Sequence, residues 1–121
     1  MGRGQRSAMG DAWFTGYADE LARCLVDARD CAEACEAYLS RLDGPEGELR
    51  RAAHVLAAPA AVSRVLIDLI DQPPQLVLAA ARLCRDLAAT AGDKLDGGPP
   101  EVVAALRAAA ESAGALVDAA G

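Results

Sequence analysis

Three of the four cysteines, Cys24, Cys31 and Cys35, share one face of a single predicted helix. They fall on an apolar stripe with alternating steps of three and four residues, which is typical of a helix that packs against other helices. The stripe consists of Phe14, Tyr17, Leu21, Cys24, Ala28, Cys31, Cys35, Tyr38 and Leu42. Thiols in such a position are either small buried hydrophobic groups or ligands for a soft metal ion.

The spacing of Cys31 and Cys35 favours metal chelation over a disulfide. A rise of 1.5 Å per residue separates them by about 6 Å along the helix, whereas a disulfide needs Cβ atoms about 3.8 Å apart. Two thiolates, each about 2.3 Å from a metal, bracket one ion with their sulfurs up to about 4.6 Å apart. We therefore expect this pair to bind a metal ion rather than to oxidise.

The composition indicates one all-α domain. A chain of 121 residues is long enough to bury a core, and the abundance of alanine with only 3% aromatic residues is typical of helices. The net charge of −6 argues against binding to nucleic acid. We expect no membrane helix and no signal peptide, and hence a cytoplasmic protein with reduced thiols.

Glycine and proline pairs divide the chain into four predicted helices. The breaks fall at Gly44–Pro45, Pro73–Pro74 and residues 97–100, and Asp11 is a candidate N-cap of the first helix. Pro59 is expected to kink or divide the second helix. The predicted helices cover residues 11–42, 46–71, 74–91 and 100–119, after a flexible N-terminal tail at residues 1–10. Short connections predict an up-down-up-down antiparallel four-helix bundle over residues 11–121.

The other three helices carry apolar stripes of their own, which predict the rest of the core. These are Leu49, Ala53, Leu56, Ala60, Ser63, Ile67 and Ile70; then Leu83, Cys84, Leu87 and Ala91; and finally Val102, Leu106, Ala109, Ala113, Leu116 and Ala120. The alanine-rich stripe of the last helix also leaves open a homodimer through that face.

Counting along the helices places the fourth cysteine. Cys84 lies about two turns before the end of its helix, as Cys35 does, and these two helices run parallel across an up-down bundle. We expect Cys31, Cys35 and Cys84 to converge as a three-thiolate site, with Cys24 deeper along the axis, either as a ligand of a second site or as an intermediate stop for the ion.

The remaining metal-ligating residue types are poorly placed for this site. His54, the single histidine, lies near the same layer but beside its stripe, so we expect it to point away. Met9 precedes the predicted first helix and is assigned no role. Thiolate sites with few ligands suit Cu(I), whereas zinc and iron–sulfur clusters take four. The predicted metal ligands are therefore Cys24, Cys31, Cys35 and Cys84, and the predicted metal is Cu(I).

The segment CLVDARDCAEACEAYL, residues 24–39, resembles the first helix of the cysteine-rich four-helix-bundle copper storage proteins. The resemblance continues through RRAAHVLAAPAAVSRVLIDLIDQ, LVLAAARLCRDLAAT and PPEVVAALRAAAESAGALVDAA. It implies a bundle whose interior cysteines, many in CxxxC pairs, hold Cu(I). This chain departs from that pattern because its second and fourth helices contain no cysteine. The resemblance therefore implies one or two bound copper ions rather than high-capacity storage.

Three functions stay open at the level of sequence. The first is a low-capacity Cu(I) carrier or sensor. The second is a metal-free helical scaffold or interaction protein, in which the thiols only fill the core. The third is a bundle that performs thiol or sulfur chemistry. No nucleophile–base pair, phosphate-binding glycine loop or di-metal motif is recognisable, so no catalytic residue is assigned.

Overall fold

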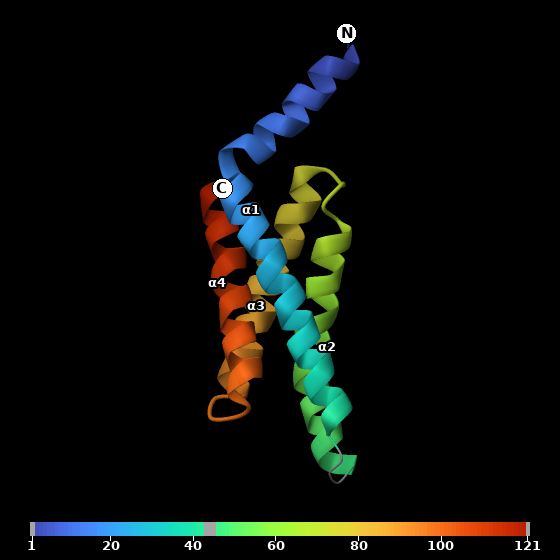
Figure 1. The fold of residues 1–121 in the computed structure, drawn as a ribbon, viewed down its shortest axis with the longest axis vertical. Coiled ribbons are helices and arrows are strands. Elements are labelled where there is room, and N and C mark those ends of the chain that lie inside the picture. The colour runs from blue at the N-terminus through green and yellow to red at the C-terminus, as the bar shows by residue number, and fades with distance from the viewer. Residues whose placement is uncertain (1, 43–45, 121) are drawn as a thin grey trace.

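The computed structural model describes residues 2–42 and 46–120, with side chains from Gly16 onward except at residues 46, 48 and 49. The described chain contains four α-helices and no strand, which confirms the predicted all-α class. The helices are α1 (Gly2–Arg41), α2 (Glu46–Asp68), α3 (Pro74–Lys94) and α4 (Pro100–Ala120) (Figure 1).

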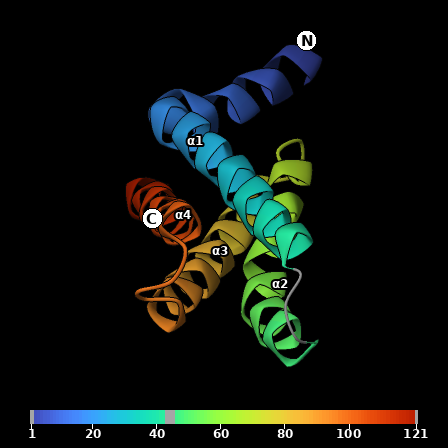
Figure 2. The same cartoon turned by 60° about the horizontal axis from the view of Figure 1, so that its bottom comes forward.

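The four helices pack around a shared core. Both α1 and α3 pack against α2 and α4, so each helix has two principal neighbours (Figures 1 and 2). Small side chains dominate the interior and let the helix axes approach closely. The largest fully buried aliphatic side chains are Leu56, Leu66, Leu106, Leu116, Val77 and Val102.

Local sequence signals account for the ends of the helices. Proline stands at the first position of both α3 and α4, where its missing N–H costs nothing. The amide of Leu95 hydrogen-bonds to the carbonyl of Ala91 at the end of α3. Gly97 then turns the chain with a φ of +84°, in the left-handed region that favours glycine. The predicted break at Gly44–Pro45 lies outside the described residues.

The start of α1 differs from the prediction. The helix begins at Gly2 rather than at residue 11, so Asp11 lies inside it and is not an N-cap. Glycine in a helix costs only about 1 kcal/mol relative to alanine, so the early glycines do not forbid helix. Tyr17 interrupts the helix with a φ of −133° and a ψ of 22°, and the preceding part turns away from the bundle (Figures 1 and 2). The flexibility of residues 1–10 stays a prediction.

The stripe predicted for α1 is confirmed at its centre, where Leu21, Cys24, Ala28, Cys31 and Cys35 are all buried. The side chain of Phe14 lies outside the described residues, and Tyr17, Tyr38 and Leu42 are half-buried. The thiols of α1 therefore face the core, as their spacing predicts.

The stripes predicted for α2 and α3 need correction. Ala53, Ile67 and Ile70 are only half-buried, and Leu83 is 51% exposed. Alanines stand on every side of these helices, so their apolar pattern defines the inner face poorly. The side chain of Leu49 lies outside the described ones. Among the described side chains of the two helices, the buried ones are Ala52, Leu56, Pro59, Ala60, Val62, Ser63, Leu66, Val77, Ala80, Ala81, Cys84, Ala88, Ala91 and Gly92. Helix α2 continues through Pro59 and is not divided there.

The stripe predicted for α4 is buried from Val102 to Leu116. Its alanines, Ala109 and Ala113, pack inside the bundle. The homodimer stays a prediction. Among the described residues, no helix has the length and apolar character needed to cross a membrane.

Leu106 and Leu83 provide a matched test of this core. Leu106 is fully buried and Leu83 is 51% exposed. We expect Leu106→Ala to lower the free energy of unfolding by about 2–5 kcal/mol, because it leaves a cavity between helices. Leu83→Ala is expected to change it by less than about 0.5 kcal/mol. Chemical denaturation of the two variants measures both values, and equal losses would contradict the described core.

Candidate metal centre

All four cysteines are free and buried in the interior of the bundle. Cys31 and Cys35 are 0% exposed, and Cys24 and Cys84 are 1% exposed. Helix α1 supplies three of the thiols and α3 supplies the fourth, so the group spans the core.

Ser63 of α2 connects thiols from the two other helices. Its hydroxyl oxygen lies 3.8 Å from the sulfur of Cys84, and the same hydroxyl lowers the pKa of Cys31. Cys35, one helical turn further along α1, has the largest effect on the pKa of Cys31. One buried hydroxyl thus joins the Cys31–Cys35 pair to the thiol of α3.

Electrostatic influence runs further along the core, because Cys84 raises the pKa of Cys24 and Cys31 raises that of Cys84. Each thiol thus acts on the next in the order Cys24, Cys84, Cys31 and Cys35, and we call this set of interacting thiols the thiol series. In the described part of the chain, no three cysteine, histidine or carboxylate side chains meet as a ready-made metal-ligand group. The three-thiolate site expected from the sequence stays a prediction.

The proton affinities of the thiols differ along the series. The hydrogen bond from Cys35 lowers the pKa of Cys31, with a further contribution from Ser63. The same hydrogen bond raises the pKa of Cys35 far above its ordinary value, and burial adds to this. Burial is also the main cause that raises the pKa of Cys84, and it raises that of Cys24 to about 12. Cys31 is therefore the thiol best prepared to act as a thiolate.

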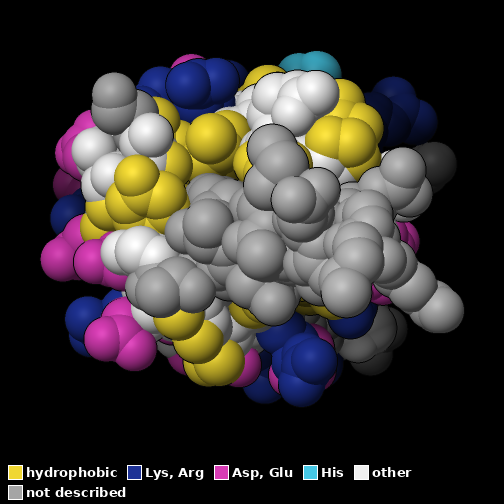
Figure 3. All heavy atoms as spheres, turned by 90° about the horizontal axis from the view of Figure 1, so that it is seen from above, with side chains coloured by type: hydrophobic (Ala, Val, Ile, Leu, Met, Phe, Trp, Pro, Cys, Tyr) yellow, Lys and Arg dark blue, Asp and Glu magenta, His cyan; other side chains and the backbone are white. Residues whose placement is uncertain are grey.

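The structure also places the other candidates. His54 is exposed, as expected, and the histidine side chain lies at the rim of the molecule in Figure 3. Met9 belongs to the part of α1 whose side chains are not described. Ser63 lay on the predicted stripe of α2 but received no role from sequence. The signal that marks it is a hydroxyl on an otherwise apolar inner face.

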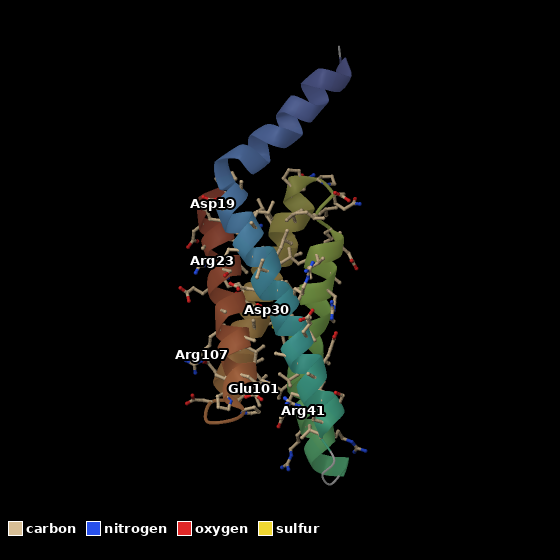
Figure 4. The ribbon with its side chains drawn as sticks, viewed as in Figure 1. Asp19, Arg23, Asp30, Arg41, Glu101 and Arg107 are labelled. Atoms are coloured by element: carbon tan, nitrogen blue, oxygen red, sulfur yellow. The ribbon has the colours of Figure 1, made fainter. Side chains whose placement is uncertain are left out.

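The charged residues form a surface separate from the thiol series. Arg41 pairs with Glu101 at 3.3 Å between α1 and α4, near the lower end of the view in Figure 4. Arg64 pairs with Glu36 at 2.7 Å between α2 and α1. These partners are about half exposed or more, so each pair contributes little to stability.

No protein-family model, curated protein or solved structure matches this chain. The assignment of the site therefore depends on its own geometry and chemistry.

Cys24 makes the stability of the fold depend on pH in the alkaline range. Its pKa is raised from 9.0 to about 12, so the unfolded chain loses this proton at lower pH than the native protein does. Its stabilising contribution is present below pH 9 and is lost as the pH rises towards 12, by about 1.4 kcal/mol per pH unit. Cys24→Ala is expected to flatten the dependence of the free energy of unfolding on pH. Parallel profiles for the variant and the native sequence would refute this.

Ser63 is expected to stabilise the Cys31 thiolate, because its hydrogen bond lowers the pKa of that thiol. Ser63→Ala should therefore raise the pKa of Cys31, which the ultraviolet absorbance of thiolate measures during a pH titration. Ser40→Ala is the matched control, because that hydroxyl is exposed and bonds only to the carbonyl of Ala37 among the described contacts. An unchanged titration in Ser63→Ala would show that the hydroxyl does not act on the thiols.

Proposed function

We propose that this chain is a low-capacity Cu(I)-binding helical bundle, a carrier or sensor, that holds one or two copper ions. Cys24, Cys31, Cys35 and Cys84 are the proposed ligands. The observation that carries the proposal is the continuity of the thiol series across the core. Thiols that only fill space have no need to neighbour one another, whereas a soft metal ion requires it.

The chemistry of the donors fits Cu(I). The series contains only sulfur donors, and soft thiolates select Cu(I), zinc and iron–sulfur clusters. Zinc and iron–sulfur sites take four ligands, whereas the described residues contain no group of even three. A soft ion with few ligands is therefore the best match.

Cys31 and Cys35 are the proposed first ligands, because they lie one helical turn apart and already share a hydrogen bond. The lowered pKa of Cys31 favours the thiolate that a metal requires, and binding would displace the proton that Cys35 holds. The bound ion would supply a positive charge to two buried sulfurs. Cys84 and Cys24 extend the same series towards a second position.

The proposal includes an up-down-up-down antiparallel bundle with a kink at Pro59. The connection between α2 and α3 lies at the opposite end of Figure 1 from the connection between α3 and α4, which supports alternating helix directions. Pro59 has no N–H and crowds the preceding turn of α2, which favours a bend there.

The proposed setting is a reducing compartment, such as the cytoplasm, because all four cysteines are free thiols. The proposed partner is the copper ion. The net charge of −6 argues against nucleic acid as a second partner.

A metal-free helical scaffold is the second candidate. The observation that favours it is the protonated state implied by the raised pKa values of Cys24, Cys35 and Cys84. Protonated, buried thiols pack as small hydrophobic groups, and these belong to the same core cluster as the leucines. Metal affinity separates the two candidates.

Titration with Cu(I) against a competing chelator, under anaerobic reducing conditions, tests the proposed function. We expect one or two ions bound per chain. Replacing both Cys31 and Cys35 by alanine should weaken binding by more than about 100-fold, because losing the ligands costs more than losing residues that only hydrogen-bond to ligands, which costs about 10–100-fold. His54→Ala is the control and should bind as the native protein does, since His54 is exposed.

Circular dichroism of each variant establishes that it is folded before its affinity is interpreted. If the native protein binds Cu(I) no more tightly than the folded double-alanine variant, the proposed copper function is wrong and the scaffold is favoured.

A further inference from the structure

Two adjoining hollows lie along the seam between α1 and α4. One, of about 200 Å³, is lined by Arg23, Asp27, Ala108, Glu111, Ser112 and Ala115. The other, of about 280 Å³, is lined by Asp19, Glu20, Arg23, Ser112 and Ala115. Because they share three residues, they form one groove, which we call the α1–α4 groove. Figure 4 shows Asp19 and Arg23 on the side of α1 that adjoins α4.

The charge of this groove favours cations. Four carboxylates, from Asp19, Glu20, Asp27 and Glu111, line it together with the single guanidinium of Arg23. A hollow with such an excess of one charge raises the local concentration of the opposite ion and speeds its capture.

The groove reaches the interior at Asp27 and Ser112. Ser112 is only 5% exposed, and its hydroxyl donates a hydrogen bond to the half-buried carboxylate of Asp27. Asp27 follows Cys24 by three residues on α1, which makes their side chains neighbours on the helix surface, and its charge acts on that thiol. Cys24 itself does not line the groove and is 1% exposed, so Asp27, one helical turn away, is the groove residue that adjoins the first member of the thiol series.

The seam between α1 and α2 has the opposite character. Its hollow, of about 270 Å³, is lined by Leu25, Val26, Arg29, Ile67 and Ile70. Four aliphatic side chains and one guanidinium offer a cation no favourable contact. Of the two seams, the one between α1 and α4 is therefore the better route for a cation.

We infer that the α1–α4 groove is the port through which a soft monovalent cation enters the thiol series, with Asp27 and Ser112 at its inner end and Cys24 as the first thiol reached. The inference deepens the proposed function, since it takes Cu(I) as the physiological ion. Access of small molecules to Cys24 through the same groove does not depend on copper.

Asp27→Asn and Asp30→Asn test the electrostatic part of the inference. Both remove one carboxylate from α1, but Asp30 is exposed and does not line the groove. Loading with Ag(I), followed by stopped-flow spectroscopy, should be about tenfold slower in Asp27→Asn at low ionic strength, with the same final stoichiometry. Asp30→Asn should load at the native rate, and high salt should reduce the effect of Asp27→Asn.

Two tryptophan variants test the route itself. Ala115→Trp places an indole in the α1–α4 groove, and Val26→Trp places one in the hollow between α1 and α2. Methyl methanethiosulfonate, a small neutral thiol reagent, replaces Ag(I), and mass spectrometry follows modification of Cys24. Ala115→Trp should slow this modification severalfold, because the indole occupies the groove that the reagent would have to cross. Val26→Trp should leave it unchanged.

The outcomes separate the port from the copper function. Equal rates in the two asparagine variants, or equal rates in the two tryptophan variants, would overturn the port. A native protein that takes up neither Ag(I) nor Cu(I) would end the proposed function, while the neutral reagent would still decide the route to Cys24.

Discussion

The burial of four neighbouring thiols beside one serine hydroxyl is the constraint on which the rest of the structure depends. The hydroxyl of Ser63 lies 3.8 Å from the sulfur of Cys84 on α3 and also lowers the pKa of Cys31 on α1. Buried polar groups need partners, so this hydroxyl favours a packing in which the three helices meet at Ser63. Thiols are weak hydrogen-bond partners, and the proposed function adds a metal ion as a stronger partner for them.

Small side chains make that convergence possible. Ala28, Ala88, Ala109 and Ala113 are almost fully buried, so the helices approach closely and bring sulfurs from α1 and α3 together across the core. The residues at the edges of each seam between helices decide whether that seam is charged or apolar. Carboxylates line the seam between α1 and α4, whereas aliphatic groups line the seam between α1 and α2. In the proposed function, the core supplies the sulfur donors and the carboxylates of the α1–α4 groove direct cations towards them.

Sequence reasoning predicted the four helices and the inner faces of α1 and α4, because leucine, valine and cysteine mark those faces clearly. It misplaced part of the inner face of α2, where Ala53 is half-buried and Leu66 is fully buried, since alanines surround that helix. It also missed the helical stretch before residue 11, which was expected to be a flexible tail. The role of Ser63 was not predictable from spacing, because it arises only where three helices meet.

X-ray absorption spectroscopy at the copper edge, on protein loaded with Cu(I) under anaerobic conditions and then desalted, identifies the atoms that bind the ion. We expect the copper to be retained with sulfur as its only ligand atom, at about two or three sulfurs per ion. Copper bound through nitrogen or oxygen, or lost on desalting, would contradict it.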